Sequence, residues 1–146
     1  MIAILSVKPK YVEQILKGNK RYEFRKSKFR KDVEEVLIYA TKPVMKVVGK
    51  FRVGKIIEDT PEKLWNDFGN VSGLTKDEFF EYFKKNNKGV AIEIIDLQEF
   101  SEPLDLNYFV AKSTYPQSWI YLSREKLNNK KEVQIKQKLY INLKYT

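Results

Sequence analysis

The 146-residue chain contains no cysteine and no histidine. Without cysteine it cannot form a disulfide, a thiolate nucleophile or a thiolate-bound metal or iron–sulfur site. Without histidine it also lacks the base of Ser-His-Asp and Cys-His mechanisms and the usual zinc ligand sets. Any catalysis must therefore depend on Lys, Tyr, Ser, Thr or carboxylate side chains, and we expect no metal and no other cofactor.

Long apolar runs are missing as well. The longest near the start, residues 2–5, is far shorter than a membrane span or the apolar core of a signal peptide. We therefore expect a cytoplasmic protein without a membrane partner. Hydrophobic residues make up 42% and aromatic residues 14% of the chain, which is sufficient for the packed core of one domain.

The charge is large and unevenly distributed. Lys plus Arg is 28 and Asp plus Glu is 19, giving a net charge of +9. Residues 1–55 carry 15 basic and 5 acidic side chains, residues 56–122 carry 6 and 12, and residues 123–146 carry 7 and 2. A basic binding face for a polyanion, built from the first third of the chain, is one interpretation. A lysine-rich, solvated surface is the other.

The hydrophobic periodicity predicts the element order β-α-β-β-β-α-α-β-β. We expect strands at residues 2–7, 21–25, 36–40, 44–57, 90–97 and 118–122, and helices beginning at Pro9, Pro61 and just after Thr75. Short connections without repeated βαβ units indicate the α+β class, with a small, curved, mostly antiparallel β-barrel and peripheral helices. Residues 1–122 form the expected domain. Residues 123–146 are a basic C-terminal extension, predicted to add a strand or hairpin.

Local signals set the expected ends of these elements. Gly18 should end the first helix, and Thr75 with Glu78 has the spacing of a capping box. Gly49 and Gly54 are candidate bulges that curve the sheet. Pro103 is expected to interrupt the chain after the fifth strand, with an irregular stretch or a helical turn following at residues 104–109.

One stretch stands out for its chemistry. Residues 18–25 have the form G-x-K-x-x-E-x-R, and strict alternation places Arg21, Glu23 and Arg25 on one strand face. Two guanidinium groups beside a carboxylate keep it ionised and retain donors for a phosphate or a base edge. The same pattern also fits an exposed charge ladder that contributes roughly 0.2–1 kcal/mol per pair.

Four motifs in this order resemble an ASCH domain of the PUA-like superfamily over residues 2–122. They are Leu5-Ser6-Val7-Lys8-Pro9, the G-x-K-x-x-E-x-R element, Tyr39-Ala40-Thr41-Lys42-Pro43 and Pro116-Gln117-Ser118-Trp119-Ile120-Tyr121-Leu122. The resemblance implies a PUA-like β-barrel with a basic cleft where the first helix, the turn of the motif and the strand ends meet. It also implies RNA binding or a role in RNA-linked regulation.

Transferred residue by residue, the resemblance marks Ser6, Lys8, Lys20, Glu23, Arg25, Thr41 and Lys42 as cleft residues. We expect Arg21 and Tyr39 to join them in nucleic-acid binding, with Lys50 and Arg52 as further phosphate contacts. The resulting hypothesis is a binding module that admits phosphate and one nucleotide or modified base. Ser6, Lys8 and Thr41 also have purely structural explanations, at a strand end, a helix start and a turn.

A hydrolase is the alternative. Some ASCH proteins are amidohydrolases that act on N4-acetylcytidine through a Lys, a Thr and a Glu. That Lys matches Lys20, but the Thr falls at Glu23 and the Glu falls near Ser72, which favours a binding module over this activity. A ribonuclease could instead use Lys20 and Glu23 as its catalytic pair. Their mutual attraction is expected to lower the pKa of Glu23 and raise that of Lys20.

Two further interpretations remain. Trp65, Trp119, Tyr39 and Tyr121 could form an aromatic cage for a modified base, although both tryptophans fit core positions better. The acidic middle segment could bind a basic protein partner. The extension could be a phosphate-contacting arm, a dimer strand or a soluble end, and the sequence leaves the ligand and the oligomeric state open.

Overall fold

The computed structural model describes residues 1–110 and 119–123. The elements are β1 (Ile2–Val7), α1 (Pro9–Leu16), β2 (Tyr22–Arg25), β3 (Glu35–Ala40), β4 (Lys46–Asp59), α2 (Pro61–Phe68), the 3-10 helix η1 (Gly69–Val71), α3 (Lys76–Phe83), β5 (Gly89–Leu104), the 3-10 helix η2 (Leu106–Tyr108) and β6 (Trp119–Leu122). Apart from the short 3-10 helices, this is the predicted order. The strand or hairpin predicted in the C-terminal extension lies outside the described residues.

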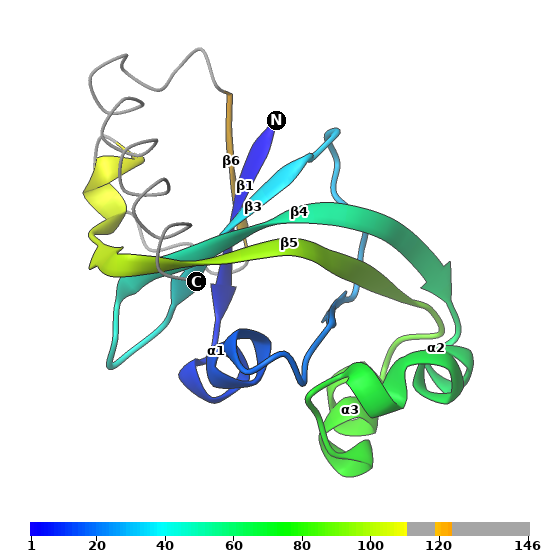
Figure 1. The fold of residues 1–146 in the computed structure, drawn as a ribbon. Coiled ribbons are helices and arrows are strands. Elements are labelled where there is room, and N and C mark those ends of the chain that lie inside the picture. Colours follow the sequence, from blue (N-terminus) through cyan, green and yellow to red (C-terminus); the bar gives the residue numbers. More distant parts are fainter. Residues whose placement is uncertain (111–118, 124–146) are drawn as a thin grey trace.

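The six strands form one mixed sheet in the order β2-β5-β4-β3-β1-β6. β1 and β3 are parallel, and every other neighbouring pair is antiparallel. The long strands β4 and β5 arch over α1, α2 and α3, so that the sheet curls into a half-barrel with the helices under its concave side (Figure 1). The predicted α+β class and the mostly antiparallel, curved sheet are confirmed.

The curvature comes from irregular pairing between β4 and β5. Their register shifts at three places, between Val47 and Gly49, between Lys50 and Arg52, and between Val53 and Ile56. Such shifts bend a strand and increase its twist. At Gly49 an added Cβ would lie 2.6 Å from the Gln98 carbonyl oxygen, so only glycine allows this close approach. The bends predicted at Gly49 and Gly54 are thus found.

Pro103 does not end the fifth strand, which corrects our expectation. β5 continues to Leu104, and its pairing with β4 jumps from Glu99, opposite Gly49, to Leu104, opposite Val47. Pro103 lies inside this jump, where its missing N–H removes no regular ladder bond. The helical turn expected in the following stretch is present as η2.

The core follows from the alternation of the buried strands. Along β1, Ile2 and Ile4 pack in the cluster that contains Leu106 of η2. Leu5 and its neighbours on the opposite face pack in the cluster that contains Ile15 of α1. A third cluster joins β2 and β5 to α2 and α3. Trp65 packs in this third cluster and Trp119 in the second, as predicted.

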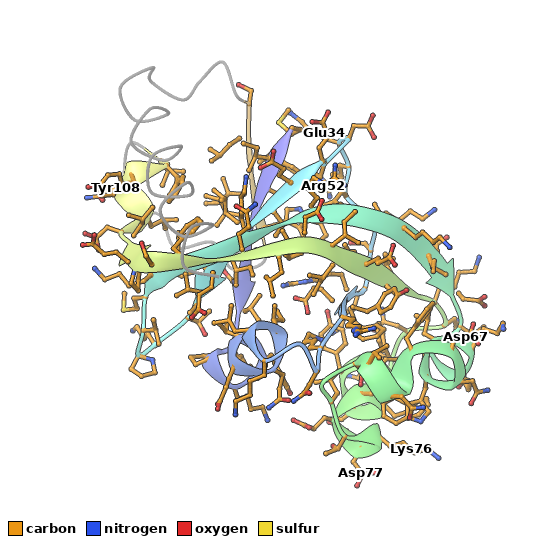
Figure 2. The ribbon with its side chains drawn as sticks, in the orientation of Figure 1. Glu34, Arg52, Asp67, Lys76, Asp77 and Tyr108 are labelled. Carbon is orange, nitrogen blue, oxygen red and sulfur yellow. The ribbon has the colours of Figure 1, made fainter. Side chains whose placement is uncertain are left out.

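The predicted helix ends are also found. Pro9 begins α1, and Gly18, with φ +84°, follows its last residues in the left-handed region. The Thr75 side chain accepts a hydrogen bond from the Glu78 N–H, and the Glu78 carboxylate accepts one from the Thr75 N–H. This capping box fixes the start of α3, whose Lys76 and Asp77 point away from the sheet (Figure 2).

Candidate functional site

A cavity of about 460 Å³ lies where the end of β1, the start of α1, β2 and α3 meet. Its volume falls within the usual range for small-ligand sites, about 300–1,000 Å³. The lining residues are Ser6, Val7, Lys8, Lys10, Tyr11, Lys20, Glu23, Phe24, Arg25, Leu74, Glu78, Glu81 and Tyr82. Segments from both halves of the described chain therefore converge on one hollow.

Three charged side chains are buried in the wall of this cavity. The exposed fractions of the Lys20, Glu23 and Arg25 side chains are 2%, 9% and 13%. Lys20 Nζ lies 3.4 Å from one Glu23 oxygen, and Arg25 Nη2 donates to the other at 2.7 Å. Lys20 also donates to the Ser72 carbonyl at 2.8 Å, and Arg25 donates to the Ser6 carbonyl at 2.9 Å. We call Lys20, Glu23 and Arg25 the buried triad.

The backbone places Lys20, rather than Arg21, beside Glu23, which corrects our expectation. Lys20 forms an isolated β-bridge with Ser72, and β2 begins only at Tyr22. The chain therefore breaks its alternation at Arg21, whose exposed side chain lines a second, more open hollow of about 660 Å³. Glu23 is flanked by one lysine and one arginine.

Gly73 completes the wall behind Lys20. Its φ of +69° lies in the left-handed region, and an added Cβ would lie 2.7 Å from Lys20 Cβ. A residue with a side chain would meet both backbone strain and a steric clash here. The turn between η1 and α3 therefore packs closely against the lysine stem and helps to bury it.

Burial shapes the acid–base properties of the triad. It lowers the pKa of Lys20, and although Glu23 pulls in the opposite direction, Arg25 adds to the lowering. Burial alone would raise the pKa of Glu23, but the nearby charges of Arg25 and Lys20 outweigh it and the pKa is lowered. The direction predicted for Glu23 is confirmed. The direction predicted for Lys20 is wrong, because charge attraction does not compensate a lysine that is almost entirely removed from water.

Glu78 ties α3 to α1 at the rim of the cavity. Its carboxylate accepts hydrogen bonds from Lys10 Nζ at 2.6 Å and from Tyr11 Oη at 2.8 Å. These bonds, with those of the capping box, lower the pKa of Glu78 to about 2. The lining as a whole holds four cations, three carboxylates and the aromatic rings of Tyr11, Phe24 and Tyr82.

Five of the nine predicted nucleic-acid-binding residues line the cavity: Ser6, Lys8, Lys20, Glu23 and Arg25. The others lie elsewhere. Tyr39 is only 3% exposed and packs in the core, while Thr41 and Lys42 follow the end of β3. Lys50 and Arg52 pair with Glu35 and Asp96 on the sheet. Their roles in binding remain predictions.

Sequence reasoning missed the part of the lining that α3 and α1 contribute. Leu74, Glu78, Glu81 and Tyr82 are spaced by four, three and one residues, which is the signature of one helical face. Periodicity could have grouped these residues. It could not have shown that this face, rather than the Phe79 face, turns toward the triad.

The Ser72 position explains how the site departs from the amidohydrolase pattern. Ser72 is fully buried, and its carbonyl accepts the Lys20 hydrogen bond. The place where the resemblance requires a glutamate therefore does lie next to the lysine. A backbone carbonyl occupies it, so Lys20 meets a neutral acceptor there instead of a second carboxylate.

No helix in residues 1–110 is long and apolar enough to cross a membrane. Within the same described part of the chain, no group of three or more Asp or Glu side chains is arranged to hold a metal ion. The chemical groups around the cavity include lysine, arginine, carboxylate and tyrosine side chains.

Residues 2–115 match the family described as "Domain of unknown function (DUF365)". An ASCH domain-containing ribonuclease of Zymomonas mobilis is 28% identical over 127 residues, which cover 84% of this chain and 85% of that protein. The ATP synthase subunit alpha of Ureaplasma parvum is 31% identical over 107 residues, which cover 73% of this chain. This chain spans only 13% of the length of that subunit.

Solved structures agree with the sequence relatives. The crystal structure of ASCH from Zymomonas mobilis superposes with a TM-score of 0.81 at 28% identity, covering 92% of this chain and 94% of that chain. A single-residue variant of the same protein gives a TM-score of 0.80 at 27% identity, covering 92% and 95%. The similarity extends over nearly the full length of both chains.

Proposed function

This chain belongs to the DUF365 family, an ASCH-type family of PUA-like fold, and from that premise we propose that it binds single-stranded RNA, with one nucleotide entering the cavity. The observation that carries the proposal is the convergence of the buried triad and the exposed Lys8 on one hollow of about 460 Å³. The name of the Zymomonas mobilis relative, a ribonuclease, supports RNA as the polymer.

The cationic side chains of the lining suit a phosphate. Lys8 is exposed at the start of α1, and Arg25 lines the same cavity. Nη2 of Arg25 is held by Glu23 and Ser6, while its Nε–H has no acceptor among the described residues. The guanidinium is thus fixed in place and keeps donor capacity for an anion.

The aromatic rings in the same lining suit a base. Tyr82 of α3 is 38% exposed, and Tyr11 of α1 faces the same cavity. A base that stacks on an exposed aromatic ring gains roughly 1–3 kcal/mol. The carboxylates of Glu78 and Glu81 repel phosphate and accept hydrogen bonds from base amino groups. We therefore expect the nucleotide to place its phosphate toward the exposed Lys8 and its base against a ring.

RNA titration at several salt concentrations tests the proposal. Lys8→Gln should weaken binding and reduce the slope of log K against log salt by about 0.7, the value for one lost single-strand phosphate contact. Lys55→Gln is the matched control, because Lys55 is also exposed but lies on β4 and does not line the cavity. Failure of mixed-sequence single-stranded RNA to bind at low salt would refute the proposal, as would equal slopes for both variants.

Cleavage of the bound strand is the second candidate function. Its support is the burial of Lys20, which lowers the lysine pKa and so favours the neutral amine as a general base. In this scheme Lys20 takes the proton of a ribose 2′-hydroxyl, whose oxygen attacks the adjacent phosphorus. The bond to the 5′ oxygen breaks, and that oxygen takes a proton from water. Glu23, held ionised by its neighbours, positions the amine rather than acting as the acid.

Product analysis separates cleavage from binding. Cleavage by this route leaves 2′,3′-cyclic phosphate and 5′-hydroxyl ends. Lys20→Met should abolish cleavage, whereas Lys55→Gln, an exposed change outside the lining, should retain it. Intact RNA after prolonged incubation with folded, RNA-bound protein would eliminate this second function and leave the first unaffected.

A further inference from the structure

A basic loop joins β2 to β3 beside the mouth of the cavity. Residues 26–31 read Lys-Ser-Lys-Phe-Arg-Lys, and all four cationic side chains are exposed. Within residues 1–110 and 119–123, no carboxylate forms a salt bridge with any of them. The loop therefore presents four positive charges on six consecutive residues, none of them in a salt bridge with another described residue.

The start of the loop is fixed to the cavity. Lys26 Nζ lies 4.8 Å from the centre of the Tyr82 ring. Tyr82 lines the cavity, as does Arg25, the residue before Lys26. Figure 1 shows the connection, in blue, running from β2 to the start of β3. An RNA strand that leaves the cavity past Tyr82 would therefore meet this loop.

The far end of the loop is fixed to a cluster of aromatic rings. The Phe29 ring lies 5.1 Å from that of Trp119 and 6.4 Å from that of Tyr121. The Arg30 backbone N–H donates to Tyr121 Oη at 2.8 Å, and Lys31 Nζ lies 5.9 Å from the Tyr121 ring. All three rings are half-buried, so part of each faces outward.

The cationic side chains of the loop and the neighbouring aromatic rings together have the composition of a binding surface for single-stranded nucleic acid. Cations that follow a phosphate backbone, next to aromatic faces on which bases stack, are the common device for binding single strands with little sequence preference. Phe29 lies three positions after Lys26, so their Cα atoms lie at most about 11 Å apart. The rings are therefore close enough to the cavity mouth to receive a following nucleotide.

We propose that the 26–31 loop and the Phe29, Trp119 and Tyr121 rings form a second contact surface that holds the nucleotides next to the one in the cavity. This inference rests on the proposed function, because it extends the same RNA strand. An oligonucleotide would then contact both the cavity and the loop, whereas a mononucleotide would contact the cavity alone. The loop would bind the phosphate backbone of the RNA, and the bases would stack on the rings.

The first test compares loop and control variants on ligands of two lengths. Lys28→Gln with Arg30→Gln should remove two phosphate contacts, reduce the salt slope by about 1.4, and weaken binding of an eight-nucleotide RNA about tenfold at 0.2 M salt. Binding of a nucleoside monophosphate should be unchanged. Lys55→Gln with Lys88→Gln removes the same charge from exposed positions away from the loop and should leave both ligands unaffected.

The second test uses the tryptophan in the cluster. The chain has two tryptophans, so in a Trp65→Phe background the fluorescence reports Trp119 alone. The eight-nucleotide RNA should quench this emission by stacking, and a nucleoside monophosphate should not. Loop variants that bind the oligonucleotide as tightly as the control, or Trp119 emission that a bound oligonucleotide leaves unchanged, would overturn the inference. Failure of both ligands to bind would instead refute the proposed function.

Discussion

Replacing Glu23 with glutamine tests whether the buried triad is held together by charge. Glutamine keeps the shape of the side chain but removes its negative charge, leaving Lys20 and Arg25 as neighbouring cations in the cavity wall. Glu23 contacts them at 3.4 and 2.7 Å, and the three side chains are 2–13% exposed. Water can therefore compensate little of the loss.

The expected cost follows from this geometry. Removing one partner of a buried ion pair generally destabilises a protein by about 3–5 kcal/mol. The value here should lie near 3 kcal/mol, because Lys20 keeps its bond to the Ser72 carbonyl and Arg25 keeps its bond to the Ser6 carbonyl. At 1.36 kcal/mol per factor of ten, this corresponds to about a 150-fold change in the folding equilibrium constant.

The pH dependence of folding stability provides a second test of the same prediction. The pKa of Lys20 is already lowered in the folded protein, so the unfolded chain binds the lysine proton more readily and stability rises with pH up to about the ordinary lysine pKa. Without Glu23 that pKa falls further, and the rise begins at a lower pH. The stability deficit of Glu23→Gln should therefore narrow between pH 7 and pH 9.5.

Urea unfolding of wild type, Glu23→Gln and Glu81→Gln at both pH values measures these effects. Glu81 also lines the cavity, but its side chain is 71% exposed and, among the described residues, it forms a salt bridge only with the exposed Lys84. Its loss should therefore cost less than about 0.5 kcal/mol. A Glu23→Gln deficit no larger than that of Glu81→Gln would refute the reasoning. A deficit that does not change with pH would show that Lys20 and Glu23 are not coupled.

Two further substitutions probe the surroundings of the triad. Gly73→Ala introduces a Cβ at φ +69° within 2.7 Å of Lys20, so it should destabilise the protein by about 1–3 kcal/mol and weaken RNA binding, as measured by urea unfolding and titration; an unchanged midpoint would contradict this. Glu78→Gln should cost about 1 kcal/mol at pH 7 by weakening the capping box and the bond to Lys10. Because the Glu78 pKa is lowered to about 2, its contribution is present above about pH 4.5 and lost as pH falls toward 2, so the difference from wild type in thermal unfolding should drop by more than half by pH 3; an equal difference at both pH values would disprove this link.

Much of the fold was predictable because local signals agreed with the tertiary structure. The first strand was predicted at the residues that form β1, and the start of α1 at Pro9 and the capping box of α3 are where the sequence placed them. The positions of buried strands and capped helices depend mainly on residues that are close together in the sequence. The course of β5 through Pro103 was not predictable, because a proline is tolerated there only through a register shift against β4.

The motif located the buried triad, but neither its burial nor the part of the lining contributed by α1 and α3 could be predicted. The motif placed Lys20, Glu23 and Arg25 within six residues. Strict alternation, however, predicted Arg21 instead of Lys20 on the strand face of Glu23 and Arg25. The break at Arg21 depends on backbone pairing with residues 71–72, about fifty positions away. The direction of the Lys20 pKa depended on the same long-range packing, since the sequence shows which charges are near but not whether water reaches them.

The arch of β4 and β5 has an architectural consequence for the cavity. One wall is carried by α1, which follows β1, and the other by α3, which lies near the opposite end of the two long strands (Figure 1). Glu78 is the side chain whose hydrogen bonds clamp one wall to the other. The width of the cavity opening therefore depends on the curvature of β4 and β5 as well as on this clamp. Deleting one residue from a bulge near Gly49 or Gly54 would reduce the curvature of β4 and β5 and widen the cavity opening, while every lining side chain stayed the same.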